Sequence, residues 1–149
     1  MRVTTLRPLA LADSKVLAAL DALCFGDEAW SEDQIVGSLS LPTTVGIGGL
    51  ESGTIIGFYL IQQTEEETEI LTLGVHPAHQ RKGIGEQMLA DIIARQRQGT
   101  IFLDVAADNL AARKLYENAG FKPFAIRPRY YRRAGCWVDA INYRYNANN

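Results

Sequence analysis

The alternation of hydrophobic and polar residues divides the chain into segments with helical and segments with strand-like periodicity. Apolar residues three and four positions apart predict amphipathic helices, whereas short apolar or alternating runs bounded by turn residues predict strands. The spacing predicts helices over residues 11–25, 31–39, 83–98 and 109–119. It predicts strands over residues 2–6, 45–50, 55–61, 69–75, 100–106, 121–131 and 137–145.

Local signals refine some of these elements. Ser31 followed by Gln34 has the form of a capping box, so the second helix should begin at residue 31. The tetrapeptide Glu-Ser-Gly-Thr at 51–54 predicts a hairpin turn. The apolar stripe expected to face the core in the first helix is formed by Val16, Leu17, Leu20 and Leu23. The stripe of the third helix is formed by Met88, Leu89, Ile92 and Ile93.

The order of the elements indicates the fold class. The strand–helix–strand step through residues 69–106 requires a right-handed parallel crossover, whereas the hairpins elsewhere require antiparallel pairs. We therefore expect an α/β fold of three layers, in which helices flank a central mixed sheet. A chain of 149 residues fits one domain, covering residues 1–149.

Composition and charge exclude several classes of protein. Hydrophobic residues make up 47% and charged residues 21% of the chain, which excludes disordered and collagen-like proteins. The 15 basic and 17 acidic residues give a net charge of −2, so no overall basic field is available to hold nucleic acid.

The cysteines and the hydrophobic runs indicate the compartment. Cys24 and Cys136 match neither a metal-binding nor a redox spacing, and two free thiols indicate a reducing environment. His76 and His79 lack further ligands nearby, so no metal site is expected. The first residues lack a signal-peptide core, and no apolar run reaches membrane-spanning length. We expect a cytoplasmic protein without a membrane segment.

A glycine-rich turn, Gln-Arg-Lys-Gly-Ile-Gly at residues 80–85, lies between a predicted strand and a predicted helix. Glycine lets a ligand approach the backbone, and the start of a helix offers unpaired N–H groups and a positive dipole. Arg81 and Lys82 add positive charge, so the turn is suited to a pyrophosphate. The Rossmann fingerprint fails because Met88 stands at its third glycine, and no Walker A sequence occurs.

This turn and a later helix resemble the GCN5-related N-acetyltransferases, the GNAT superfamily. Val-His-Pro at 75–77 and Gln-x-x-Gly-x-Gly at 80–85 are similar to that family's acetyl-CoA signature. Asn109, Ala112, Leu-Tyr-Glu at 115–117 and Gly-Phe at 120–121 are similar to its next motif. The element order also agrees over essentially the whole chain. The resemblance implies a GNAT-like fold with acetyl-CoA as the cofactor.

The resemblance also implies which residues hold the cofactor. Amides of the turn would bind the CoA pyrophosphate, Asn109 would contact the pantetheine arm, and the amides of Leu73 and Val75 would face the thioester. The implied cofactor-binding residues are Leu73, Gly74, Val75, Gln80, Arg81, Lys82, Gly83, Ile84, Gly85, Asn109 and Tyr116. The alternative is an ordinary glycine-capped turn between a strand and a helix.

Tyr116 is the candidate acid. Acyl transfer from a thioester needs a neutral amine, a stabilised oxyanion and a protonated leaving thiolate. Asn109 and Tyr116 are nearly two helical turns apart and so share one face. The resemblance implies that the Tyr116 hydroxyl protonates the CoA thiolate, for which a phenol with a pKa of about 10 is competent. The alternative is a core tyrosine on an amphipathic helix.

Two carboxylates are candidates for the catalytic base. Asp104 lies in an apolar strand that would bury it, at high cost for an unpaired carboxylate. Glu69, aligned on the glycine turn, falls at the glutamate that histone-acetylating members of the superfamily use as base. Either could act through water. Alternatively, Glu69 belongs to a solvated acidic run, and Asp104 only pairs with an arginine such as Arg127 or Arg129.

Within the superfamily, the chain is most similar to the RimI enzymes, which acetylate the N-terminal alanine of a ribosomal protein. The matching positions are Trp30-Ser31, Leu103-Asp104-Val105, Asn109, Leu115-Tyr116-Glu117, Tyr130-Tyr131 and Asp139-Ala140. Asp104 replaces the glutamate that serves as base in that group. Residues 132–137 lack the group's usual Pro and carry a bulky Trp137. These departures leave the ribosomal acceptor and the choice between Glu69 and Asp104 open.

The resemblance implies direct transfer of an acetyl group to the N-terminal alanine α-amine of a protein. The expected substrate-binding residues are Trp30, Tyr130 and Tyr131, and since strand side chains alternate, one tyrosine at most should line a given face. The nearby arginines at 127, 129, 132 and 133 guard a strand edge or attract an acidic group. Alternative functions are acetylation of a small-molecule amine and a non-catalytic acyl-CoA-binding module. We expect a monomer or a weak dimer.

Overall fold

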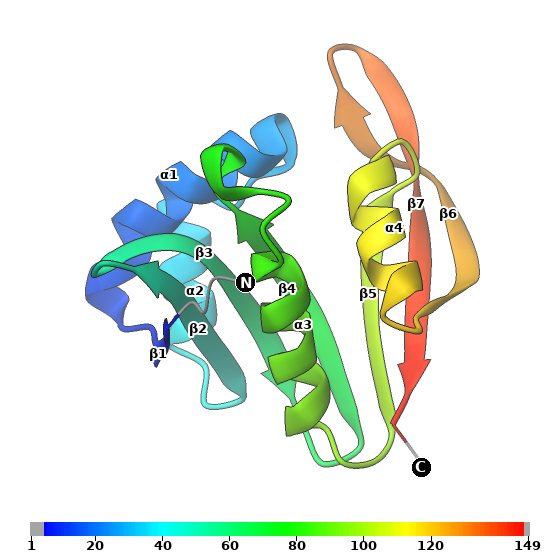
Figure 1. Cartoon of the computed structure of the whole chain (residues 1–149). Helices are drawn as coiled ribbons and strands as arrows, with labels where there is room; N and C mark the ends of the chain where they lie inside the picture. The colour runs from blue at the N-terminus through cyan, green and yellow to red at the C-terminus, as the bar shows by residue number, and fades with distance from the viewer. Residues whose placement is uncertain (1–4, 148–149) are drawn as a thin grey trace.

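The computed structural model describes residues 5–147, in which helices cover both faces of a seven-stranded sheet (Figure 1). The strands are β1 (Thr5–Pro8), β2 (Thr44–Glu51), β3 (Thr54–Gln63), β4 (Glu67–Val75), β5 (Thr100–Ala106), β6 (Lys122–Arg133) and β7 (Cys136–Asn146). The helices are α1 (Ser14–Phe25), α2 (Glu32–Leu39), α3 (Ile84–Arg95) and α4 (Leu110–Asn118). Short 3-10 turns are η1 (Leu11–Asp13), η2 (Gly26–Glu28) and η3 (Pro77–His79).

The sheet has the strand order β1-β2-β3-β4-β5-β7-β6, which confirms the predicted mixed sheet. Neighbouring strands are antiparallel except β4 and β5, which are parallel, as predicted for the step through α3. This parallel pairing is short, because it joins Glu67–Glu69 to Thr100–Phe102. Beyond these residues β4 and β5 diverge toward their carboxyl ends, as Figure 1 shows.

Each face of the sheet has its own hydrophobic core. Met88 of α3 and Tyr59 of β3 belong to one core, which also includes residues of α4. Leu17 of α1 and Phe58 of β3 belong to the other, which also includes residues of α2. Because consecutive strand residues point to opposite faces, α3 and α4 cover one side of the sheet and α1 and α2 the other.

The stripe predicted for the first helix is partly wrong. Leu17 and Leu20 are buried, but Val16 is 53% and Leu23 is 59% exposed. The buried face of α1 instead includes Asp21, a polar residue four positions after Leu17. The hydrophobic pattern could not show this face because a buried carboxylate occupies part of it. In α3, by contrast, Met88, Leu89 and Ile92 are buried as predicted.

Most element boundaries agree with the prediction within a few residues. Ser31 caps α2 as expected, since its Oγ accepts from the Gln34 N–H at 3.1 Å and the Gln34 Oε1 accepts from the Ser31 N–H at 2.9 Å. α3 ends at Arg95 because the Gln96 side chain turns inward and donates to the carbonyls of Glu65 and Gln98. The first strand is seen over Thr5–Pro8, and residues 2–4 of its predicted range lie outside the described part.

A β-bulge interrupts β4 at Leu71. The adjacent residues Leu60 and Ile61 of β3 pair with Thr72 and Ile70 of β4. Leu71, which lies between Thr72 and Ile70, is therefore the extra residue of the bulge. Leu71 and Thr72 therefore both face α1, and Leu73 returns to the α3 side. Bulges of this kind re-aim side chains beside functional sites.

Over residues 5–147, no helix combines the length and the apolar character needed to cross a membrane.

Candidate active site

Two adjoining cavities lie where β4 and β5 separate. The first, here called the glycine cavity, has a volume of about 400 Å³ and is lined by the glycine turn and the start of α3. The second, here called the tyrosine cavity, also has a volume of about 400 Å³ and is lined by Tyr116, Tyr131 and Asp104, among others. Five residues line both cavities, namely Cys24, Phe25, Leu73, Asn109 and Ala112. A ligand can therefore extend from one cavity into the other.

The glycine turn presents backbone N–H groups to the glycine cavity. Gly83 caps α3 in a left-handed conformation with φ of 83°, which glycine adopts without strain. The first helical hydrogen bond runs from the Gln87 N–H to the Gly83 carbonyl, so the amides of residues 84–86 have no partner inside the helix. The Gln80 side chain holds the turn against β4 by donating to the Val75 carbonyl at 3.0 Å. These amides, the helix dipole and Arg81 are suited to a pyrophosphate.

The structure brings together nearly all of the predicted cofactor-binding residues. Those that line the glycine cavity are Leu73, Gly74, Val75, Gln80, Arg81, Gly83, Ile84, Gly85 and Asn109. Tyr116 lines the tyrosine cavity. Lys82 is exposed and lines neither cavity, because the turn directs its side chain to solvent.

The free edge of β4 presents two amides to the gap between the strands. The His76 N–H donates to the Ile56 carbonyl of β3 at 2.7 Å. Because N–H groups along a strand point alternately to its two neighbours, the amides of Leu73 and Val75 point away from β3. No β5 residue pairs with this part of β4, so in the described structure both amides face the cavities. This orientation is the one required of oxyanion donors.

Tyr116 combines core packing with access to the tyrosine cavity. Its ring packs against Phe121 and Tyr143, with centroids 5.6 and 6.4 Å away. Burial, with a smaller contribution from Tyr131, raises the pKa of its hydroxyl, which therefore stays protonated. Tyr116 also lines the tyrosine cavity, where a ligand could accept a hydrogen bond from its hydroxyl. Asn109, two turns earlier, caps α4 by accepting from the Ala112 N–H at 3.1 Å.

Asp104 is neither fully buried nor unpaired, which corrects the expectation from its apolar strand. Its carboxylate accepts from Asn142 Nδ2 at 3.1 Å and lies 3.5 Å from Arg127 Nε. The reason is the divergence of β5 from β4, which leaves one face of β5 open to the tyrosine cavity. Asp104 thus has the arginine partner anticipated for it and also lines the cavity.

Glu69 lies beside Asp104 rather than in the cavity wall. It pairs in register with Phe102 of β5, whose side chain shares a strand face with that of Asp104. Burial raises the pKa of Glu69, the negative charge of Asp104 raises it further, and Arg127 partly offsets these effects. A carboxyl with a raised pKa beside a cavity is typical of a proton acceptor.

The aromatic residues predicted to contact the substrate do not all line the tyrosine cavity. Trp30 and Tyr131 line the tyrosine cavity. Tyr130 does not line it and is exposed, with its ring 4.9 Å from that of Tyr131. This agrees with the expectation that at most one of the two tyrosines lines a given face.

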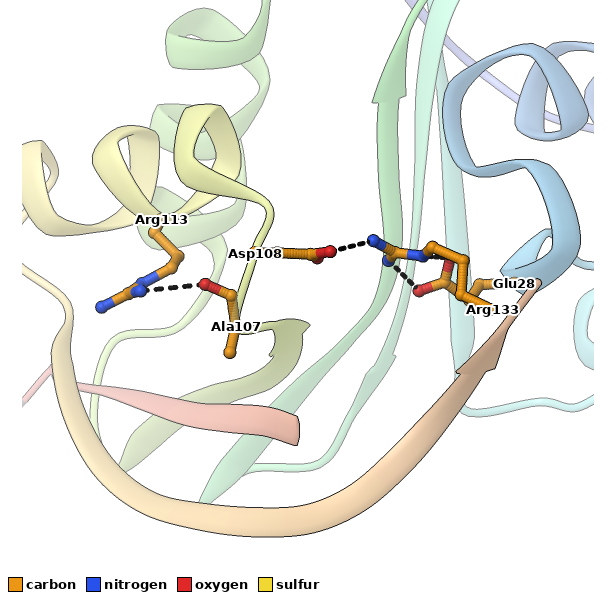
Figure 2. A network of polar contacts seen from close by, with 5 residues as sticks. All are labelled: Glu28, Ala107, Asp108, Arg113 and Arg133. Carbon is orange, nitrogen blue, oxygen red and sulfur yellow. Dashed lines mark hydrogen bonds and ion pairs between the residues drawn. The ribbon is translucent and has the colours of Figure 1, made fainter. Parts of the chain in front are cut away.

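An ionic clasp that no sequence pattern indicated lies at the rim of the tyrosine cavity (Figure 2). Arg133, at the end of β6, lies between Glu28 of η2 and Asp108, which precedes α4. Its Nη2 lies 2.5 Å from Glu28 Oε1, and its Nη1 contacts Asp108 Oδ2. The loop carrying Asp108 is held further by Arg113, which donates to the Ala107 carbonyl at 2.9 Å. No local pattern could reveal this clasp, because its members lie on three distant segments.

Within the described residues, no group of three or more His, Cys, Asp and Glu side chains could hold a metal ion. The polar groups that the described site offers are two carboxylates, one phenol and the amides that point away from β3. Asp104 and Tyr116 line the tyrosine cavity, Leu73 lines both cavities, and Glu69 lies beside Asp104.

Comparison with known proteins identifies the family. Residues 10–121 match the model of the acetyltransferase (GNAT) family. The chain is 35% identical over 145 residues to the N-alpha-acetyltransferase RimI of Mycobacterium tuberculosis, covering 94% of this chain and 90% of that protein. It is 34% identical over 94 residues to the [ribosomal protein bS18]-alanine N-acetyltransferase of Escherichia coli, covering 61% and 64% of the two chains.

Solved structures share the fold. The ribosomal-protein-S18-alanine N-acetyltransferase from Escherichia coli superposes with a TM-score of 0.90 at 24% identity, over 99% of this chain and 96% of that one. A phosphinothricin acetyltransferase from Sinorhizobium meliloti, in complex with acetyl-CoA, gives a TM-score of 0.82 at 17% identity, over 99% and 90%. The cofactor is acetyl-CoA. The chain belongs to the acetyltransferase (GNAT) family and is an acetyl-CoA-dependent N-acetyltransferase.

Proposed function

We propose that this enzyme acetylates the N-terminal alanine α-amine of a protein, with a ribosomal protein as acceptor. The observation that carries the proposal is the tyrosine cavity, in which aromatic walls and a carboxylate meet beside the glycine cavity. The similarity to RimI of Mycobacterium tuberculosis, over nearly the full length of both chains, supports it. An acceptor of this kind would place the reaction in the cytoplasm, as the sequence predicts.

The proposed roles follow from the positions of the groups. Acetyl-CoA, when bound, supplies a thioester carbonyl open to attack by an amine. The amides of Leu73 and Val75 point where negative charge would develop on the carbonyl oxygen. The hydroxyl of Tyr116 stays protonated and would donate its proton to the leaving sulfur.

The base is assigned to the carboxylate pair. Asp104 lines the cavity and Glu69 lies behind it with a raised pKa, so the pair can accept a proton from the acceptor ammonium through water. The negative charge of Asp104 contributes to the raised pKa of Glu69, so a change at Asp104 also acts on Glu69. The aromatic side chains of Trp30 and Tyr131 would form the walls that hold the first residue of the acceptor.

The proposal is tested by following thiol release from acetyl-CoA with a panel of acceptors. The panel contains peptides that begin with alanine, serine, glycine or methionine, the N-acetylated alanine peptide as a matched blocked control, and small amines such as a polyamine and free alanine. We expect kcat/KM for the alanine peptide to exceed that of every free amine by about 10-fold or more. Faster turnover of a small amine would instead identify a small-molecule acetyltransferase. Acetyl-CoA binding without turnover of any acceptor would indicate a non-catalytic module.

A further inference from the structure

Asp21, on the buried face of α1, is a carboxylate for which the proposed chemistry has no use. Its side chain is fully buried, with an exposed fraction of 0%. Both of its oxygens accept hydrogen bonds, Oδ1 from the Thr72 hydroxyl at 2.8 Å and Oδ2 from the Trp30 N–H at 2.8 Å. Burial raises its pKa, and these two donors partly offset that effect. Neither donor is a cation, so the carboxylate is held by neutral groups alone, a costly arrangement.

Asp21 and both of its donors line the tyrosine cavity, but the two donors come from different segments of the chain. Thr72 lies in β4 directly after the bulge and directly before Leu73, whose amide faces the cavities. Trp30 lies in the wall of the tyrosine cavity, immediately before the residue that caps α2. A single carboxylate therefore links the strand edge that would face the thioester to the wall that would face the acceptor.

The same helix holds β4 at a second point. The Cys24 thiol, three residues after Asp21, donates to the Val75 carbonyl at 3.2 Å. Between the two contacts, α1 packs directly on Gly74, where an added Cβ would lie 3.1 Å from Cys24 Sγ. The segment of β4 from Thr72 to Val75 does not pair with β5. It is hydrogen-bonded to α1 at both of its ends.

We propose that Asp21 is a positioning residue that sets the direction of the Leu73 and Val75 amides and, through Trp30, the place of the acceptor wall. This inference rests on the proposed roles of those amides and that wall. Over this segment β4 pairs with β3 but not with β5, so the hydrogen bond from Thr72 to Asp21 supplies a constraint that β5 does not. Misplacing catalytic donors by about 1 Å can cost 100-fold in rate.

The test compares Thr72→Val with Thr72→Ser, which retains the hydroxyl, and with Thr68→Val as a matched control. Thr68 is also a buried threonine of β4, and its hydroxyl donates to Gln96 Oε1 at 2.5 Å, but it lines neither cavity. We expect Thr72→Val to lower kcat about 10- to 100-fold while the dissociation constant of acetyl-CoA changes less than about 3-fold, because the amides act on charge that develops only during the reaction. Thr72→Ser should restore most of kcat, and Thr68→Val should leave kcat within about 2-fold of the wild type.

Asp21→Asn tests the link to the acceptor wall. Since it disturbs both hydrogen bonds, we expect it to lower kcat as Thr72→Val does and to raise the KM of the acceptor peptide further than Thr72→Val, although Thr72 also lines the tyrosine cavity. A folded Thr72→Val or Asp21→Asn protein with wild-type kcat would overturn the inference.

An independent readout separates this inference from the proposed function. In ¹H–¹⁵N spectra, Asp21→Asn should shift the amide resonances of Trp30, Leu73 and Val75 together, and Thr68→Val should not. If the wild type turns over no amine, the proposed function fails, and the spectra still decide the positioning role. Unshifted Leu73 and Val75 resonances in Asp21→Asn would refute that role whatever the activity.

Discussion

The guanidinium of Arg133 donates two hydrogen bonds, of 3.2 and 2.5 Å, to the carboxylate of Glu28, a residue 105 positions earlier in the chain. This fork joins the end of β6 to η2, and the contact of Arg133 with Asp108 extends it to the loop before α4. Asp108 is 52% exposed whereas Glu28 is largely buried, so the clasp runs from the solvent edge of the tyrosine cavity into its wall. It is therefore placed to influence both stability and acceptor access.

Arg133→Gln should lower stability modestly and disturb acceptor binding. The pairs are partly exposed, so we expect a loss of about 1 kcal/mol of unfolding free energy, which corresponds to a fall in Tm of about 2–4 °C. The KM of the acceptor peptide should change more than that of acetyl-CoA, because all three clasp residues line the tyrosine cavity. Thermal unfolding and steady-state kinetics measure these effects. Arg132→Gln is the matched control, since Arg132 lies over Trp137 outside the clasp, and equal effects of the two variants would contradict the assignment.

Tyr116→Phe should lower kcat about 100-fold or more and leave acetyl-CoA affinity nearly unchanged, because it removes a proton donor but keeps the ring in the core. Steady-state kinetics measures kcat, and calorimetric titration measures the affinity for acetyl-CoA. Tyr143→Phe is a suitable control, since Tyr143 packs beside Tyr116 and its hydroxyl bonds Glu117 rather than facing a cavity. Unchanged turnover in Tyr116→Phe would remove this residue from the reaction.

The acid limb of the pH–rate profile should report the pKa of Glu69. A base works when deprotonated, so activity should fall as the pH drops through a pKa that burial and Asp104 have raised. Asp104→Asn removes the neighbouring negative charge and should move this limb to lower pH. Arg127→Gln removes the cation that lowers the pKa of Glu69 and should move the limb to higher pH, by a small amount because Arg127 is 55% exposed.

The same profiles decide between the two carboxylates. If Glu69 is the base, Glu69→Gln abolishes the acid limb and Asp104→Asn only displaces it. If Asp104 is the base, Asp104→Asn lowers kcat at every pH. Profiles that neither variant alters would mean that deprotonation of the amine depends on neither residue.

Arg81→Gln should weaken acetyl-CoA binding about 2- to 5-fold, with an effect that shrinks at high salt, since an exposed charge contributes up to about 1 kcal/mol. Lys82→Gln carries the same change of charge one residue away, but its side chain lies outside the glycine cavity. Calorimetric titration of both variants with CoA at two salt concentrations makes the comparison. Equal losses of CoA affinity in the two variants would show that the turn acts on CoA only through its overall charge.

Several parts of the site could be predicted because their signals are local. The helical and strand periodicities located nearly every element, and the glycine turn between β4 and α3 indicated where unpaired backbone amides lie. Asn109 and Tyr116 could be placed on one helix face because helical geometry determines the spacing. Each of these inferences depends on residues within about two turns of one another.

Other parts depend on how distant segments meet. The apolar pattern placed Val16 and Leu23 in the core, but α1 buries Asp21 instead, because Thr72 and Trp30 supply its hydrogen bonds. Pairing of Asp104 with an arginine was one of two alternatives left open by the sequence, and only the structure decided it, since Arg127 lies on β6 and Asn142 on β7.

The sequence alone therefore determined the elements, their order, the mixed sheet and the glycine turn, since backbone propensity and hydrophobic spacing act over a few residues. Only the tertiary structure decided which groups face the reaction. The bulge at Leu71 and the early separation of β4 from β5 turned the Leu73 and Val75 amides toward a cavity, and the path of β6 brought Arg133 to Glu28. Strand register and divergence are collective results of packing, which no short stretch of residues encodes.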